Sequence, residues 1–171
     1  SGAWFSSWQG KQLSSNNLSD RLVSRGMRSV DSVDRVWDLN ASQGGALRQD
    51  RLWYFGSFRH WGVDAPIADT FYSDGTAAGT AACFRRAIEC RQAVDDQHAW
   101  SGLARLTWQV SPKMRLASYY ARTGKYRGHA MTAGTDATTA AVVWRKPIDY
   151  NGQVKVTSTL TNRLLVEGGY S

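Results

Sequence analysis

The chain lacks any long apolar run. No window approaches the roughly 18 consecutive apolar residues that a membrane-spanning helix needs, which excludes a helical membrane protein. The first residues, Ser1-Gly2-Ala3-Trp4, also lack an initiator Met, a basic region and an apolar region, so there is no signal peptide to read. Because the chain also ends abruptly at Gly169-Tyr170-Ser171, we expect residues 1–171 to be a fragment of one larger domain.

Proline and methionine are scarce, with three residues each, whereas tryptophan is abundant, with eight. Aromatic residues make up 12% of the chain, although its mean hydropathy is −0.44. A chain this polar is not expected to need so many rings for an ordinary core. The rings therefore call for another role, and membrane–water interfaces favour tryptophan and tyrosine.

The chain has only two cysteines, Cys83 and Cys90. Their spacing matches no recognised metal motif, and metal binding would require histidine or further cysteine nearby, so we expect no metal site. A disulfide that closes a short surface loop is the better interpretation, and it requires an oxidising compartment such as the bacterial envelope. The alternative is two unpaired thiols on a short helix.

Catalytic motifs are absent as well. The three histidines, His60, His98 and His129, have no partner motif around them. We find no His-Glu-x-x-His, no Gly-x-Ser-x-Gly and no phosphate-binding loop, and the neighbouring Asp95 and Asp96 are typical of solvated charge. The sequence therefore predicts a protein that is not an enzyme and has no cofactor.

The formal net charge of +7 raises the question of nucleic-acid binding. The arginines are scattered singly, however, without the clustered stripe or recognised motif of a nucleic-acid-binding domain. We expect no nucleic-acid partner. Charge distributed in this way is typical of a solvated lumen and of loops, and anionic lipid or lipopolysaccharide headgroups are its natural neighbours.

Period-two alternation is clearest between His98 and Arg122. It runs on both sides of Ser111-Pro112-Lys113, which is typical of a tight turn because proline fixes φ. One face of the resulting pair of strands carries most of the apolar residues, namely Ala104, Leu106, Trp108, Val110, Met114, Leu116 and Tyr120. The sequence therefore predicts a long antiparallel hairpin with an apolar face.

Two further hairpins follow the same pattern. One spans residues 37–59 and turns at residues 48–51, and the other spans residues 153–170 with a turn expected at Ser158-Thr159. The strands of each hairpin exceed about 10 residues, whereas strands of soluble proteins average about 5 to 6. We count about seven strands in all.

Long polar stretches separate the hairpins, from Gly62 to Gln97 and from Gly124 to Thr139, and a short loop helix is expected within Asn16–Gly26. Tight turns on one side and long loops on the other are typical of outer-membrane barrels, in which the long loops are extracellular. We therefore expect an all-β fold, part of a transmembrane antiparallel β-barrel that forms an open curved sheet in isolation. The expected interface aromatics on its lipid face are Trp108, Tyr120 and Tyr170.

Three segments resemble the barrel of the TonB-dependent receptors, especially the subgroup with an N-terminal carboxypeptidase-regulatory-like domain. Residues Gly44–Phe58 look like that family's glycine pair, charged periplasmic turn and aromatic strand. Residues Arg105–Lys113 and Lys125–His129 are similar to later barrel strands and the start of a loop. Nearly the whole chain fits this resemblance. It implies that a ligand binds outside and that the TonB complex pulls on an internal plug to open a barrel of about 22 strands.

The resemblance implies a transport receptor for an unknown small solute in the bacterial outer membrane. No TonB box or plug sequence is found here, so coupling to TonB would belong to other parts of the parent protein. The candidate ligand-binding residues at strand ends are Arg59, His60, Trp61, Tyr126, Arg127 and His129. Two alternatives stay open: a soluble aromatic-rich β-sandwich of the carbohydrate-binding type, and a structural or adhesive barrel without a plug. Strand length and one-sided loops favour the receptor.

Overall fold

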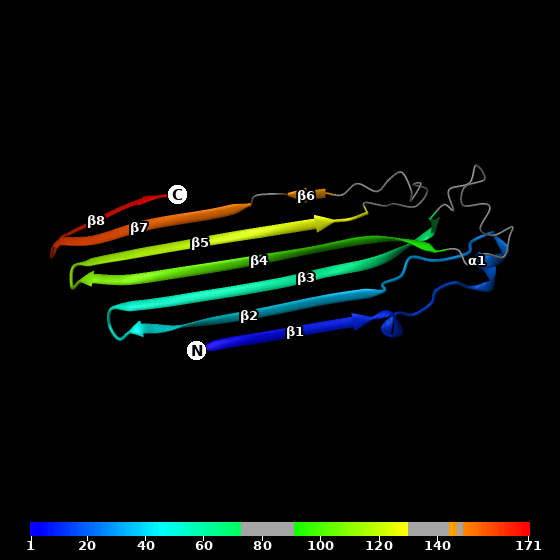
Figure 1. Ribbon diagram of the computed structural model, residues 1–171, viewed down its shortest axis with the longest axis horizontal. Helices are drawn as coiled ribbons and strands as arrows, with labels where there is room; N and C mark the ends of the chain where they lie inside the picture. The colour runs from blue at the N-terminus through cyan, green and yellow to red at the C-terminus, as the bar shows by residue number, and fades with distance from the viewer. Residues whose placement is uncertain (73–90, 130–143, 147–148) are drawn as a thin grey trace.

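One antiparallel sheet makes up nearly all of the fold (Figure 1). The computed structural model describes residues 1–72, 91–129, 144–146 and 149–171. The strand order is β1-β2-β3-β4-β5-β7-β8, and the short β6 pairs with the end of β5. The strands are β1 (Gly2–Gly10), β2 (Arg35–Arg48), β3 (Leu52–Phe71), β4 (Gln92–Ser111), β5 (Met114–Arg127), β6 (Trp144–Lys146), β7 (Tyr150–Thr161) and β8 (Leu164–Tyr170).

The connections divide between the two ends of the sheet. Tight turns join β2 to β3, β4 to β5 and β7 to β8 at one end, and β3 and β5 end at the other (Figure 1). We call these the turn end and the loop end. The short helices η1 (Lys11–Leu13) and α1 (Asp20–Ser24) lie at the loop end. The predicted loop helix is thus confirmed, although it spans only five residues; Ser19 precedes it without a side-chain cap, and Gly26, with φ of 94°, follows it.

The strands extend further than the sequence predicted. The expected loop from Gly62 to Gln97 is wrong at both of its ends, because β3 continues to Phe71 and β4 begins at Gln92. The expected loop from Gly124 likewise begins too early, since β5 runs to Arg127. Polar side chains misled the prediction. Backbone pairing does not require an apolar side chain, so the hydrogen-bonded ladder continues through these polar residues.

The predicted turn at Ser158-Thr159 is also wrong. Ser158 lies inside β7, where it is paired with Met114 on one side and Val166 on the other. The chain turns at residues 162–163 instead. Serine and threonine were interpreted as turn residues, but β-branched threonine is also favoured within strands. The turns predicted at residues 48–51 and at Ser111-Pro112-Lys113 are confirmed, although Ser111 is the last residue of β4.

The sheet has almost no core. Among the described residues the only buried apolar side chains are Pro66, Phe71, Ala93 and Ala99. The accessible surface is 12108 Å², whereas a compact folded chain of this mass would expose about 8,400 Å². No second sheet packs on either face within the described part of the chain. Within the described residues, both faces of the sheet are therefore open.

Successive hairpins are staggered at the turn end. The pairing of β3 with β4 stops at Leu52 and Trp108, so residues 109–111 extend beyond the preceding turn. In the same way, Met114 pairs with Ser158, so residues 159–161 extend beyond the β4–β5 turn. Each hairpin is thus offset from the previous one by three residues, or about 10 Å along the strand, over a width of two strands, or about 9.6 Å. If all the turns lie at one height, this offset corresponds to a strand tilt of about 45° from the barrel axis.

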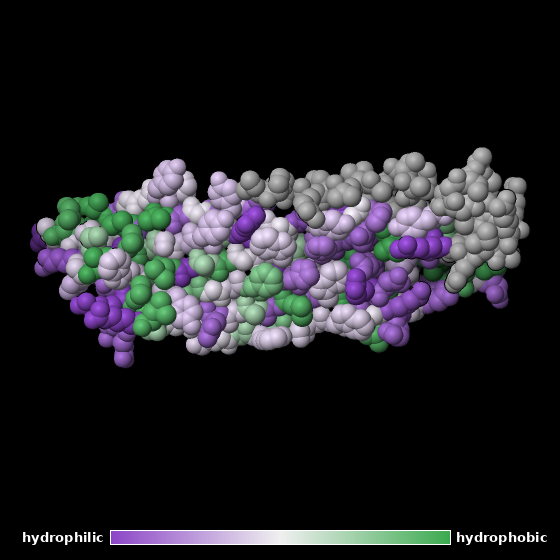
Figure 2. Space-filling model, in the orientation of Figure 1, coloured by the Kyte–Doolittle hydropathy of each residue, from purple (hydrophilic) through white to green (hydrophobic). Residues whose placement is uncertain are grey.

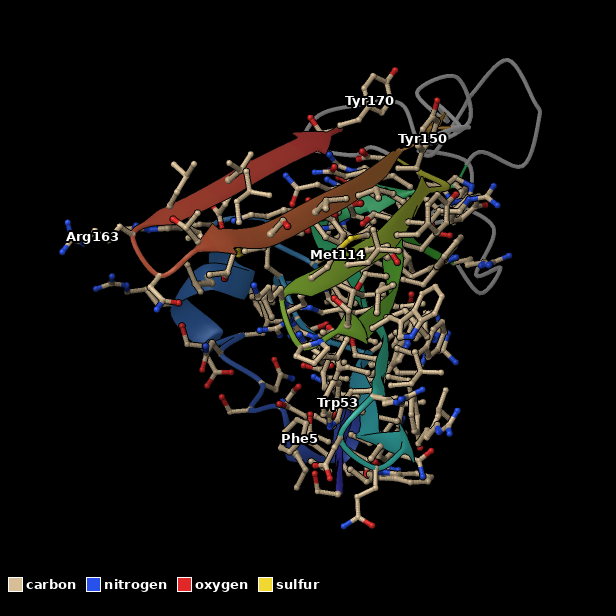
Figure 3. The ribbon with its side chains drawn as sticks, turned by 90° about the vertical axis from the view of Figure 1, so that its left-hand side faces the viewer. Phe5, Trp53, Met114, Tyr150, Arg163 and Tyr170 are labelled. Carbon is tan, nitrogen blue, oxygen red and sulfur yellow. The ribbon has the colours of Figure 1, made fainter. Side chains whose placement is uncertain are left out.

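The sheet is curved, and its two faces differ. Viewed along the strands, Tyr150 and Tyr170 project from the convex side and Phe5 lies on the concave side (Figure 3). Strand pairing assigns the remaining residues, because directly opposed residues share a face. In Figure 2 hydrophobic side chains gather at the turn end of the visible face, and hydrophilic ones lie toward the loop end. No described helix is long and apolar enough to cross a membrane.

Candidate functional site

An apolar band covers the convex face near the turn end. Leu52 of β3, Trp108 of β4, Leu116 of β5 and Val156 of β7 form one continuous row of opposed residues across four strands. Neighbouring rows are also apolar, and several of their side chains are 42–50% exposed, namely Leu106, Val154, Leu164 and Val166. A surface patch this large and contiguous is uncommon on soluble monomers and indicates contact with an apolar partner.

Aromatic rings border this band toward the loop end. The rings of Trp37, His60, His98 and Tyr126 follow one another across β2 to β5, with centroids 5.8, 5.6 and 4.7 Å apart. Trp100 lies in the same region of β4, beneath the guanidinium of Arg122 at 5.8 Å. These residues form a second zone on the convex face, the aromatic zone, in which rings and cations replace aliphatic side chains.

The aromatic zone lies at a constant distance from the turns. Trp37, Trp100, Tyr126 and Tyr150 are each eleven or twelve residues from the turn end of their own strand. On strands tilted by 35–45°, that separation corresponds to a height of about 25–30 Å. Four independent strands therefore place a ring at the same level.

Small residues make room for these rings. Gly62 is paired with Trp37, and Gly124 is paired with Trp100. A Cβ added to either glycine would overlap the indole on the opposed strand. Each indole therefore lies flat over the glycine backbone of its neighbour, an arrangement that compensates for the missing glycine side chain.

The three aromatics that the sequence assigned to the lipid face all lie on the convex face. Trp108, Tyr120 and Tyr170 are 45%, 51% and 84% exposed. Pairing with the apolar row places Trp108 close to the turns, whereas Tyr120 is six residues along β5. They therefore do not share one level. The sequence analysis did not find the level shared by Trp37, Trp100, Tyr126 and Tyr150. That level depends on where each strand ends, which periodicity alone does not give.

The concave face is polar and held by ion pairs. Arg59 of β3 donates two hydrogen bonds to Asp38 of β2, at 3.0 and 2.7 Å. Lys155 of β7 contacts Glu167 of β8 at 2.8 Å. Such pairs are hydrated charges on a wet surface and each contributes little stability. Pairing neutralises these charged side chains on a face that no core covers.

Arg127 and Asp95 form another concave pair at the loop end. The Arg127 guanidinium donates through Nε and Nη2 to the two carboxylate oxygens of Asp95. These hydrogen bonds raise the pKa of Arg127 further above its ordinary value. Arg127 is therefore a fixed cation, and its planar group is oriented by the carboxylate.

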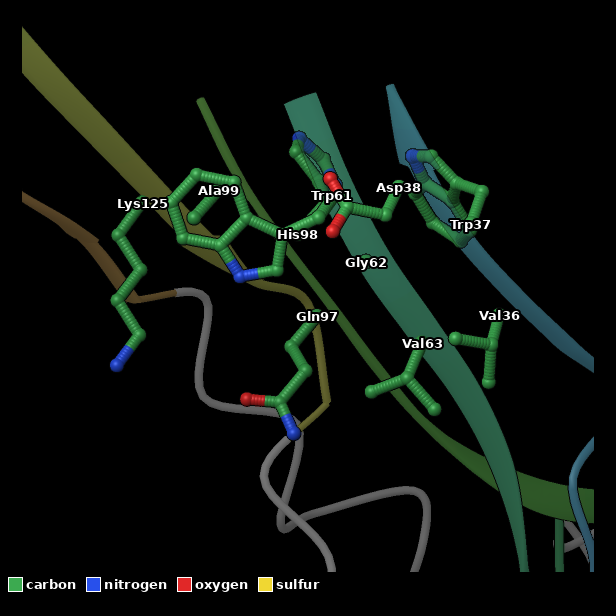
Figure 4. A pocket seen from close by; sticks show the side chains of 10 residues that line it. All are labelled: Val36, Trp37, Asp38, Trp61, Gly62, Val63, Gln97, His98, Ala99 and Lys125. Carbon is green, nitrogen blue, oxygen red and sulfur yellow. The ribbon is translucent and has the colours of Figure 1, made fainter. Parts of the chain in front are cut away.

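An open hollow of about 480 Å³ lies at the loop end of the sheet (Figure 4). The indole of Trp61 reaches over Ala99 toward Lys125, and Asp38 and Gln97 line the same hollow. Ala99 is buried beneath this ring. We call this the loop-end hollow. It combines a flat apolar surface with amide, ammonium and carboxylate groups, which are the components of a site for a small polar solute.

The predicted ligand-binding residues do not form one site. Register places Arg59, Trp61 and Arg127 on the concave face, but places His60 and Tyr126 on the convex face, in the aromatic zone. Neighbours along a strand point to opposite sides, so a run of consecutive residues cannot line one surface. His129 follows β5, where its Nδ1 lies 2.6 Å from Asp96.

The sequence did not select Asp38, Gln97 and Lys125, although all three line the loop-end hollow. Period-two alternation would have favoured Lys125, which is two residues from Arg127, over the adjacent Tyr126. Asp38 and Gln97 could not have been found in this way, because their proximity depends on the pairing of β2, β3 and β4.

A second concave hollow, of about 440 Å³, lies at the turn end. We call it the turn-end hollow. It lies between β3, β4 and β5, and its lining includes two aromatic rings and two arginines. The concave residues that line it are Trp53, Phe55, Arg105, Thr107 and Arg115.

The structure does not test the predicted disulfide. Cys83 and Cys90 lie outside the described residues, so their predicted disulfide stays a prediction. Among the described residues there is no group of three or more histidine, cysteine, aspartate or glutamate side chains that could hold a metal ion.

No protein-family model, curated protein or solved structure matches the chain.

Proposed function

We propose that the chain is a segment of a transmembrane antiparallel β-barrel in the bacterial outer membrane, and that this barrel is a transport receptor for a small solute. The carrying observation is the contrast, within one coreless sheet, between the apolar band of the convex face near the turn end and the ion-paired polar side chains of the concave face. Lipid would cover the first and the aqueous lumen would hydrate the second.

The dimensions of the sheet support a membrane span. Strands β3 and β4 have 20 residues each, about twice the 9–11 that cross a bilayer, so their loop ends would project beyond it. The aromatic zone would lie at the outer interface, about 25–30 Å above the turns, where tryptophan and tyrosine are favoured. The stagger of the hairpins gives the tilt of about 45° that barrel closure requires.

The open edges support a larger barrel. β1 and β8 have no outer neighbour among the described strands, and unpaired backbone groups are costly in lipid. Further strands of the parent protein would satisfy them. Coupling to TonB, which the sequence resemblance implies, would then act through those other parts of the protein and through an internal plug.

The receptor function rests on the loop-end hollow. It lies on the concave, lumenal side, at the end that would face the cell exterior, so a solute from outside would meet it first. Trp61 provides a flat surface, and Gln97 and Lys125 provide hydrogen-bond donors beside it. A purely structural barrel has no requirement for such a recess.

Thiol labelling tests the membrane orientation. In the full-length protein with C83S and C90S substitutions, single cysteines are placed at adjacent positions, V154C against Q153C and L106C against R105C. In outer membranes, the convex cysteines should react with a membrane-soluble maleimide and the concave ones with a charged, water-soluble maleimide. A soluble β-sandwich also predicts that the concave cysteines react with the charged reagent, but its convex face would be packed in a core, so the convex cysteines would react with neither maleimide. Equal reaction at both members of each pair would rule out the proposed orientation.

A further inference from the structure

The concave face carries an excess of positive charge. Register assigns six cations and three anions to it on strands β2 to β5, β7 and β8. The cations are Arg59, Arg105, Arg115, Lys125, Arg127 and Lys155, and the anions are Asp38, Asp95 and Glu167. Each anion is already paired with a cation, Asp38 with Arg59, Asp95 with Arg127, and Glu167 with Lys155. The other three cations, Arg105, Arg115 and Lys125, all belong to the β4–β5 hairpin.

Two of these cations lie in the turn-end hollow. Arg105 and Arg115 are both exposed, and neither makes an ion pair with a described residue. The opposed pair Thr107 and Ala117 lies along the strands between them. Both of these side chains are small, and Thr107 is buried, so the two long guanidinium-bearing chains border a low floor.

Aromatic rings form the other wall of this hollow. Trp53 is directly opposed to Thr107, and Phe55 is directly opposed to Arg105. They are 36% and 41% exposed, on the face that carries the ion pairs Arg59–Asp38 and Lys155–Glu167. Apolar rings that face a wet lumen beside uncompensated arginines indicate a ligand that has both a flat apolar part and an anionic group.

The turn-end hollow repeats the arrangement of the loop-end hollow. In the loop-end hollow, Trp61 of β3 is opposed to Ala99 of β4 and lies beside Lys125. In the turn-end hollow, Trp53 of β3 is opposed to Thr107 of β4. It lies beside Arg105 and Arg115. The two tryptophans are eight residues apart on one strand, or about 26 Å. The same face therefore offers a ring and a cation twice along the path from the loop end to the turn end.

We propose that the turn-end hollow is a second binding site, which takes a small carboxylate-bearing solute with a flat ring. The guanidinium groups of Arg105 and Arg115 bind the carboxylate, and the rings of Trp53 and Phe55 contact the flat body of the solute. This inference rests on the proposed receptor function, since the hollow then lies along the path of a solute that has left the loop-end hollow.

The test uses the full-length protein in detergent micelles with 4-nitrobenzoate, whose nitro group quenches tryptophan fluorescence. Saturable quenching is expected, with a component that W53F removes. The R105Q/R115Q variant should weaken binding at least tenfold, because charge-assisted hydrogen bonds are lost, whereas R105K/R115K should retain most of the affinity. R163Q, at the exposed β7–β8 turn, is the matched control and should leave binding unchanged. Neutral 4-nitrobenzyl alcohol should bind poorly to every variant.

Three results would overturn the inference. They are an absence of saturable quenching, equal quenching by the acid and the alcohol, and equal affinity of the parent protein and R105Q/R115Q. Unchanged circular dichroism of R105Q/R115Q shows that a weakened affinity of this variant is not caused by misfolding. A failure of this kind is separate from a failure of the proposed function, because thiol labelling of the two faces reports membrane orientation whether or not 4-nitrobenzoate binds.

Discussion

The indole of Trp100 on β4 lies over Gly124 on β5, where a Cβ would overlap the ring. The two residues are directly opposed, and the guanidinium of Arg122 lies 5.8 Å above the same indole. Glycine is required here by close approach and not by its backbone angles, since Gly26 is the only described glycine with a positive φ. The position of the Trp100 ring in the aromatic zone thus depends on Gly124, which has no side chain.

We expect G124A to destabilise the folded protein by about 1–3 kcal/mol, the usual cost of overpacking. The added methyl group would displace the Trp100 indole from its position under Arg122. Urea unfolding in lipid vesicles measures the loss of stability, and tryptophan emission should shift as the ring moves.

Gly102, on the convex face of the same strand pair, is the matched control. A Cβ there would lie 4.0 Å from the Phe58 ring, which is an ordinary contact, so G102A should change stability by less than about 0.5 kcal/mol. In a W100L background G124A should also become nearly neutral. Equal losses for G124A and G102A would contradict this account of the glycine.

Charge placed on the two faces should have different costs. L106R puts a cation in the apolar band of the convex face, which costs about 2–4 kcal/mol if lipid covers it. L103R, three residues away on the concave face, should cost less than about 1 kcal/mol because water reaches it. Yield of assembled protein in the outer membrane and unfolding in vesicles are the measurements. Equal costs for the two variants would mean that lipid does not cover the convex face.

The three hairpins were predictable because strand alternation is local. The β4–β5 turn at Pro112-Lys113 was placed correctly, since proline is informative by itself, whereas Ser158-Thr159 is compatible with both turn and strand. The strand ends at Phe71 and Gln92 were missed because polar side chains do not end a ladder. What a single sequence cannot give is register. The Trp100–Gly124 contact and both concave hollows depend on which residues of neighbouring strands are opposed.

The β2–β3 turn depends on the conformation of Asp50, whose φ is 57°. Aspartate tolerates the left-handed region, whereas a β-branched residue is strained there. D50V should therefore cost about 1–2 kcal/mol, and D50G should be nearly neutral or slightly stabilising. K113V in the β4–β5 turn is the control, because Lys113 has no positive φ. Unfolding of all three variants in vesicles would show the order; a neutral D50V would mean that the turn adopts another conformation.

The isolated 171-residue chain should not remain monomeric in water. Among the described residues nothing covers the apolar band of its convex face, and β1 and β8 present unpaired edges. Exposed edges with apolar faces pair with other chains. We expect light scattering to rise on dilution from denaturant into buffer, and to stay low in detergent micelles, which would cover the convex face. A soluble monomer with a sharp cooperative melt in buffer would instead require a core that a single open sheet does not provide, and would favour a soluble β-sandwich.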